Sequence, residues 1–211
     1  MQTREILQTW LWRPRRRGSA VFATAALLIV MGSAPSQAQG PFLAGAYSFS
    51  DELGGFTIAS VSGSGTRNDP VVLTEELYSA TPVTLTIRTT RPILAFDDSG
   101  EFANGTLYMR IVVQNASGQG WVEFEFELQE VLNKPSTFGD GLSFDQRAEN
   151  RAAISSDSLN EFSRDFEPYD KLLFRKGHVD PGDTAGFSFL ITDFTPRWEF
   201  FLVQDPRIPS T

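Results

Sequence analysis

The 211-residue chain contains no cysteine. Disulfide bonds, thiolate metal sites, a cysteine nucleophile and a lipid anchor on cysteine are therefore excluded. A chain of this length can still bury a hydrophobic core without covalent cross-links. We expect the 18 phenylalanines to supply much of that core.

Histidine is almost absent as well, because His178 is the single one. A serine nucleophile needs a base to activate it, and catalytic zinc usually takes several histidine ligands, so both kinds of site are disfavoured. His178 lies in a Gly- and Pro-rich stretch, which indicates an exposed turn. Glycoside hydrolysis needs only two carboxylates, so the scarcity of histidine leaves that chemistry open.

The longest apolar run, from Ala20 to Met31, is shorter than the roughly 20 residues that cross a bilayer. An arginine block precedes the run, and Ser36 and Ala38 follow it at the −3 and −1 positions of a cleavage site. This pattern predicts a helical, cleavable signal peptide at 1–38 and export to the periplasm or the medium. An uncleaved anchor, with the run extended to Ala34, is the alternative. The export route, general secretory or twin-arginine, stays open. The arginine block consists of Arg13, Arg15, Arg16 and Arg17.

Acidic residues outnumber basic ones, and the net charge is −8. Removing 1–38 takes away five arginines and one glutamate, which leaves 13 basic and 25 acidic residues and a net charge of −12. Such a surface repels nucleic acid and anionic membranes and favours cations and solubility. We therefore expect no nucleic-acid partner and no stable membrane insertion after signal cleavage.

Strict alternation of apolar and polar residues predicts strands. In 121–129, Phe124, Phe126 and Leu128 share one face, and the glutamates share the other. Similar runs separated by Gly and Pro turns predict one antiparallel β-sandwich domain at 39–211, immunoglobulin-like or jelly-roll-like, with about 9–10 strands. The other expected strands are 56–62, 71–78, 83–88, 106–116, 171–175, 185–192 and 198–204.

The runs 106–116 and 121–129 flank a Ser-Gly-Gln-Gly turn signal, which predicts a hairpin. A two-residue loop at Gly118 and Gln119 places Glu127 opposite Arg110 and matches the apolar face of each strand with that of the other.

Alternation stops in 146–166. Ser158 and Glu161 fit a capping box, and Leu159, Phe162 and Phe166 follow helical spacing. We therefore predict one short helix within a long loop there.

Two surface features suggest ligands. Asp97, Asp98 and Glu101 form a loop cluster of oxygen donors that suits calcium, although the cluster lacks the EF-hand pattern. Trp121 is predicted to share the polar strand face with the glutamates, so it is our candidate sugar-stacking residue. Calcium is the only cofactor that the sequence suggests.

Three segments resemble uncharacterised exported bacterial proteins with immunoglobulin-like domains: GSGTRNDPVVLTEE at 63–76, DGLSFDQ at 140–146 and VDPGD at 179–183. The resemblance spans most of 39–211. It implies the sandwich fold and carries no assigned activity. We expect a non-enzymatic binding, adhesive or envelope-associated protein with a protein or glycan partner. The alternatives are a carbohydrate-active hydrolase with paired carboxylates and a calcium-stabilised surface domain.

Overall fold

The structure, a computed structural model, describes residues 40–145, 153–164 and 166–209. The predicted signal peptide at 1–38 lies outside these residues. Within them, no helix has the length and hydropathy to cross a membrane. The strands are β1 (Phe42–Ala44), β2 (Tyr47–Ser50), β3 (Phe56–Ser62), β4 (Val71–Leu77), β5 (Val83–Thr89), β6 (Thr106–Asn115), β7 (Glu123–Gln129), β8 (Leu142–Phe144), β9 (Ser155–Ser156), β10 (Leu159–Ser163), β11 (Lys171–Gly177), β12 (Thr184–Asp193) and β13 (Glu199–Arg207).

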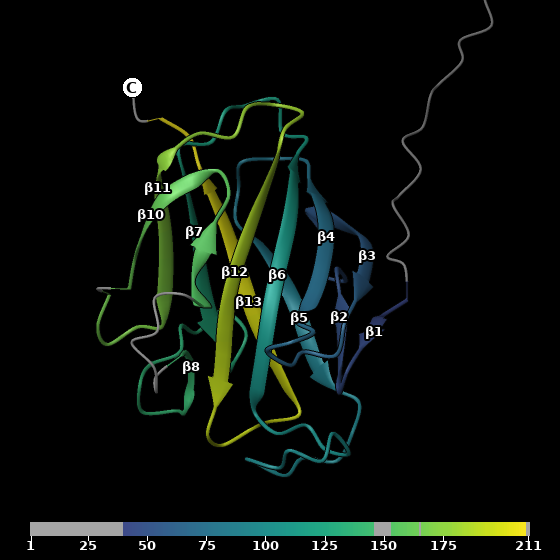
Figure 1. The fold of residues 1–211 in the computed structure, drawn as a ribbon. Coiled ribbons are helices and arrows are strands. Elements are labelled where there is room, and N and C mark those ends of the chain that lie inside the picture. Colours follow the sequence, from purple (N-terminus) through teal and green to yellow (C-terminus); the bar gives the residue numbers. More distant parts are fainter. Residues whose placement is uncertain (1–39, 146–152, 165, 210–211) are drawn as a thin grey trace, which may run out of the picture. The chain divides into compact units, whose positions relative to one another are not determined.

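The strands form two stacked sheets (Figure 1). The first has the order β1-β2-β5-β13-β7-β11-β10, and the second has the order β3-β4-β6-β12-β8, with β9 also paired to β12. The predicted β-sandwich is confirmed. All eight strands expected from alternation are present, and the short strands β1, β2, β8, β9 and β10 add to them. Those five are too short, or too irregular in sequence, for alternation to reveal.

One strand pair departs from the expected antiparallel arrangement. β4 runs parallel to β6, with Val71 opposite Met109 and Leu77 opposite Asn115. The strand between them in sequence, β5, belongs to the other sheet. The chain therefore leaves the second sheet after β4 and re-enters it at β6 in the same direction, as a parallel pair requires.

The predicted hairpin between β6 and β7 is wrong. β6 pairs with β12, where Arg110 lies opposite Ser188, and β7 pairs with β11, where Glu127 lies opposite Lys171. The two strands lie in different sheets, and their apolar faces meet across the core. Matched apolar faces are expected both for two strands of one hairpin and for two strands that face each other from opposite sheets. The sequence pattern therefore could not distinguish these two arrangements.

The predicted helix is also wrong where it can be seen. Residues 146–152 and 165 lie outside the described residues, but Leu159–Ser163 forms strand β10. β10 pairs with β11, with Phe162 opposite Phe174 and their ring centroids 6.3 Å apart. The edge of β11 supplies backbone partners and an apolar neighbour, and this tertiary pairing overrides a weak local helix signal.

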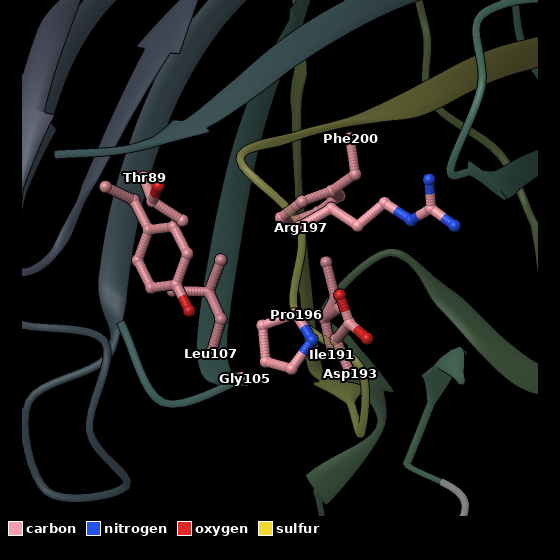
Figure 2. A pocket seen from close by; sticks show the side chains of 9 residues that line it. Thr89, Gly105, Leu107, Ile191, Asp193, Pro196, Arg197 and Phe200 are labelled. Carbon is pink, nitrogen blue, oxygen red and sulfur yellow. The ribbon is translucent and has the colours of Figure 1, made fainter. Parts of the chain in front are cut away.

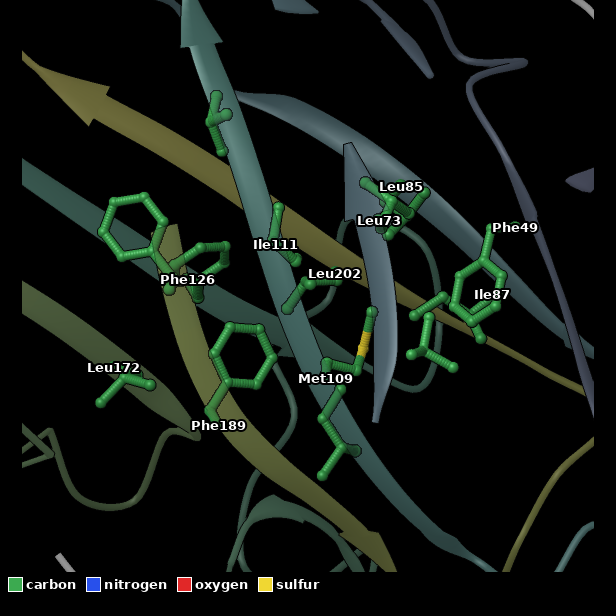
Figure 3. Packing of buried hydrophobic residues seen from close by; sticks show 14 of the residues in the cluster. Phe49, Leu73, Leu85, Ile87, Met109, Ile111, Phe126, Leu172, Phe189 and Leu202 are labelled. Carbon is green, nitrogen blue, oxygen red and sulfur yellow. The ribbon is translucent and has the colours of Figure 1, made fainter. Parts of the chain in front are cut away.

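A layer of phenylalanines joins the sheets (Figure 3). Phe126 of β7 lies 5.2 Å from Phe187 and 4.9 Å from Phe189 of β12, measured between ring centroids. Phe124 approaches Phe187 to 4.7 Å. Phe126 is fully buried. Tilted and edge-on aromatic contacts add to the stabilisation that burial of apolar surface provides.

The outer face of the first sheet carries an ion-pair network rather than freely solvated glutamates. Glu125 is 5% exposed and pairs with Lys171 at 3.1 Å and with Arg207 at 2.5 Å. Lys171 also pairs with Glu127 at 2.6 Å. The long side chains from β11 and β13 cover the carboxylates of β7 and link three neighbouring strands.

A polar cluster lies inside the sandwich. Glu75 of β4 faces the core and accepts a 3.1 Å hydrogen bond from the side-chain amide of Gln204 on β13. Burial raises the pKa of Glu75 to about 8, and the nearby Asp51 carboxylate also raises it. Glu75 Oε1 and Gln204 Oε1 lack hydrogen-bond partners among the described residues. A proton on Glu75 therefore adds a donor to a cluster that is rich in acceptors.

We expect Phe126→Ala to lower the free energy of unfolding by about 3–5 kcal/mol, because it leaves a cavity between the sheets. Urea denaturation measures the change. Leu43→Ala, at a strand residue that is 69% exposed, is the matched control and should stay within about 0.5 kcal/mol of wild type. Equal effects of the two substitutions would contradict the assigned packing.

The Glu75 carboxyl should make stability depend on pH. Its pKa is raised from 4.5 in the unfolded chain to about 8 in the fold, so its contribution is fully present below pH 4.5 and is lost as the pH rises towards 8. Glu75→Gln cannot ionise. We expect it to match wild type near pH 5 and to exceed it at pH 9 by a few kcal/mol.

Urea denaturation at several pH values measures this difference. Glu76→Gln, at the next residue on the opposite face of β4, should keep the wild-type pH dependence. Parallel stability profiles for wild type and Glu75→Gln between pH 5 and pH 9 would show that Glu75 does not control the effect.

Candidate functional site

Six connecting segments meet at one end of the sandwich, which we call the loop end (lower edge of Figure 1). The strand registers place them there. Thr106 lies opposite Thr192, Tyr47 lies opposite Thr89, and the Tyr108 N–H donates to the Gly65 carbonyl at 2.9 Å. The loop end comprises 45–46, 63–70, 90–105, 130–141, 166–170 and 194–198.

The loop end gathers most of the exposed apolar side chains. Eight of the twelve large hydrophobic residues that are exposed within the described ranges lie on it. Trp198 is 63% exposed and Phe96 is 55% exposed. Apolar side chains concentrated on one part of a surface often mark an interaction site. The eight are Ile93, Leu94, Phe96, Val131, Leu132, Phe138, Tyr169 and Trp198.

The loops are tied to one another. The Thr195 hydroxyl donates to the Asp140 carbonyl at 2.7 Å, and Arg197 forms an ion pair with Glu130, so segment 194–198 is fixed to segment 130–141. The ring centroids of Phe96 and Phe194 lie 5.9 Å apart, and this contact links the 90–105 loop to segment 194–198. The loop end is therefore a preorganised surface, which lowers the entropic cost of binding.

Gly105 anchors the 90–105 loop to the body of the sandwich. Its carbonyl accepts a 2.7 Å hydrogen bond from the Asp193 N–H, and its φ is +76°. A Cβ at this position would lie 2.1 Å from the Asp193 carbonyl oxygen, which is a backbone atom and cannot move aside easily. Only glycine fits at this position, where the residue before β6 lies against the end of β12.

A small hollow lies beneath this anchor, between Tyr47, Leu107, Asp193 and Phe200 (Figure 2). Its volume of about 10 Å³ matches about one water molecule. Burial raises the pKa of Tyr47 to about 12 and also raises the pKa of Asp193. Asp193 accepts the Thr195 N–H at 2.9 Å. We interpret this hollow as structural, since it supports the 194–198 turn.

A second hollow of about 200 Å³ is lined by Glu130, Lys134 and Asp140. Asp140 Oδ2 accepts the Thr137 N–H at 2.9 Å, and Oδ1 accepts the Leu142 N–H at 3.1 Å. Both oxygens of Asp140 therefore hold the backbone of their own turn.

The third hollow, which we call the groove, has a volume of about 210 Å³ and lies between the 63–70 and 90–105 loops. Arg67 enters it from the first loop and Arg91 from the second, and Tyr108 of β6 forms part of its wall. In the sequence, β4 and β5 separate these two loops, and β5 belongs to the opposite sheet. The parallel pairing of β4 with β6 nevertheless brings the loops together.

The calcium candidates lie on the exposed 90–105 loop. Asp98 and Glu101 are exposed, and Asp97 Oδ1 accepts the Ser99 N–H at 2.9 Å, a local turn contact. Among the residues that the structure describes, no three His, Asp or Glu side chains are grouped so that they could hold a metal ion. Calcium binding by Asp97, Asp98 and Glu101 stays a prediction without a convergent set of ligands.

The expectation that Trp121 is an exposed stacking residue is wrong. Trp121 is 0% exposed, and its indole N–H donates to the Ser117 hydroxyl at 3.1 Å. Its backbone pairs with Val179, and a bend at Val122 separates this bridge from β7. The bend breaks the alternation, so Trp121 joins the core beside Phe124. His178, by contrast, is exposed as expected, and it lies between the end of β11 and the bridge residue Val179.

Local sequence patterns did not single out Arg67 or Arg91. Each lies next to a turn, where an arginine is ordinary, and only the crossover between the sheets brings them to one groove. Of the resemblance to exported immunoglobulin-like proteins, the structure supports the two-sheet all-β sandwich fold. Comparison of the chain with protein-family models, curated proteins and solved structures finds no match.

We expect Gly105→Ala to destabilise the protein by more than Gly118→Ala. Both residues have a positive φ, which costs a non-glycine residue on the order of 1–3 kcal/mol, but a Cβ at Gly118 meets nothing within 4 Å. Thermal unfolding of the two variants measures the additional cost of the clash with Asp193. Equal midpoints would contradict the role of Gly105 as an anchor.

Proposed function

We propose that this chain is an exported, non-enzymatic recognition protein that binds its ligand at the loop end and works at the cell envelope. The observation that carries this proposal is the concentration of exposed aromatic and aliphatic side chains, Trp198 and Phe138 among them, on loops that are fixed to a rigid sandwich. Binding residues are often found on loops that a stable scaffold positions.

Export is part of this proposal, and its support comes from the arginine block, the short apolar run and the small residues in 1–38. An acidic surface and a cysteine-free core are compatible with the periplasm and with the medium. The phenylalanine layer explains how the domain stabilises itself in those compartments without disulfides.

A carbohydrate hydrolase is the second candidate, because Glu130 and Asp140 line the same hollow. In such a hydrolase, one carboxyl group acts as the general acid and the other acts as the nucleophile or the general base. Both carboxylate oxygens of Asp140 accept hydrogen bonds from backbone N–H groups, and Glu130 forms an ion pair with Arg197. These contacts favour a structural role for both carboxylates, so binding without turnover is the better interpretation.

The test is co-sedimentation of the mature chain with washed cell envelopes. We expect the chain to sediment with the envelopes and the double variant Phe138→Ser/Trp198→Ser to stay in the supernatant, because it removes two exposed apolar contacts from the loop end. The matched control is Tyr78→Ser/Ile208→Ser, which removes two exposed apolar side chains elsewhere on the surface and should sediment like wild type.

Near-identical thermal midpoints of the variants would show that the fold is intact. Failure of wild type to sediment, or equal sedimentation of the loop-end variant, would overturn the proposal. Time-dependent release of reducing ends from envelope polysaccharide, lost in Glu130→Gln, would favour the hydrolase instead.

A further inference from the structure

The groove between the 63–70 and 90–105 loops has an unusual charge for this protein. The chain has a net charge of −8, yet the charged residues that line the groove are Arg67, Arg91 and Asp98. Cations therefore outnumber anions here, against the balance of the whole molecule.

The two arginines also differ from most other basic residues of the chain. Among the described residues, most lysines and arginines pair with Asp or Glu, as Arg88 does with Glu52 and Glu199. Arg67 has no ion-pair or hydrogen-bond partner in the described part of the chain, and Arg91 donates only to the Gly100 carbonyl there. Both guanidinium groups retain donors for a ligand.

The rest of the groove suits a hydroxylated ring. The hydroxyls of Thr106 and Tyr108 have no hydrogen-bond partner among the described residues, and both line the groove. Phe102 and Tyr108 add aromatic surface. A volume of about 210 Å³ is below the 300–1,000 Å³ of typical pockets for larger ligands, so the groove fits a single ring.

We propose that the groove binds one uronate residue of an envelope glycan, with Arg67 and Arg91 holding the carboxylate and Thr106 and Tyr108 contacting the ring hydroxyls. The planar arginine fork matches a carboxylate, and the free hydroxyls match a sugar better than they match a simple inorganic anion. This inference rests on the proposed function, because it identifies the ligand class of one part of the loop end.

The overall charge narrows the ligand further. The chain without 1–38 has 13 basic and 25 acidic residues, and its net charge of −12 repels a dense polyanion at long range. The groove therefore favours a glycan with few carboxylates, such as a short oligouronide, over a long polyuronate whose many further charges the acidic surface repels.

Isothermal titration with digalacturonate tests the proposal, and the methyl ester of the same disaccharide serves as the uncharged probe. We expect wild type to bind digalacturonate and to bind the ester at least about tenfold more weakly, since the ester removes the charge-assisted hydrogen bonds. Arg67→Gln should lose about tenfold in affinity for digalacturonate. Asp98→Asn should gain affinity, because it removes the one repelling charge in the groove.

Arg175→Gln is the matched control, since it removes an exposed arginine outside the groove and changes the net charge equally. It should bind as wild type does. The Arg67 side chain forms no hydrogen bond or ion pair with another described residue, so Arg67→Gln should fold normally. Arg91→Gln also removes the hydrogen bond to the Gly100 carbonyl and serves as the second variant.

Equal affinity for the acid and its ester, or unchanged binding by Arg67→Gln, would overturn the proposal. Competition by acetate or phosphate as strong as that by digalacturonate would do the same, since it would mean a general anion site. The proposed function fails separately, when envelope sedimentation does not depend on Phe138 and Trp198.

Discussion

The contact between the phenylalanines of β7 and β12 is the interaction on which the rest of the molecule depends. Phe126 touches both Phe187 and Phe189, so each sheet covers the apolar face of the other. With no disulfide and no described metal cluster to fasten them, the sheets are held by burial and aromatic packing. The fixed spacing of the sheets then determines where the loops of both can meet, and this makes the loop end a continuous surface.

Much of the fold could be predicted because burial on one face imposes a period of two, as Phe124, Phe126 and Leu128 show. Pairing could not be predicted in the same way. The inner faces of β6 and β7 are both apolar because both face the core, and this is as true for strands of opposite sheets as for a hairpin. The helix prediction for Leu159–Ser163 was wrong for a related reason. Pairing with β11, which lies later in the sequence, determines the strand conformation of this segment.

The candidate site was harder to predict than the fold. Residue type and local spacing point to Asp97, Asp98, Glu101 and Trp121, but neither property shows whether a side chain is buried or whether several side chains converge on one point. Trp121 became a core residue through one bend at Val122. Arg67 and Arg91 have no local signature, because their proximity follows from the parallel pairing of β4 and β6, which a sequence pattern does not encode.

The cysteine-free core has a consequence for engineering. Because the sandwich is stabilised without disulfides, its folding does not depend on the redox state of the compartment in which it is made. The loop end is a set of neighbouring segments that connect the strands of the sandwich. A library that varies 63–70 and 90–104 while keeping Gly105 could therefore be displayed and selected inside a reducing cytoplasm, where disulfide-dependent immunoglobulin domains lose stability.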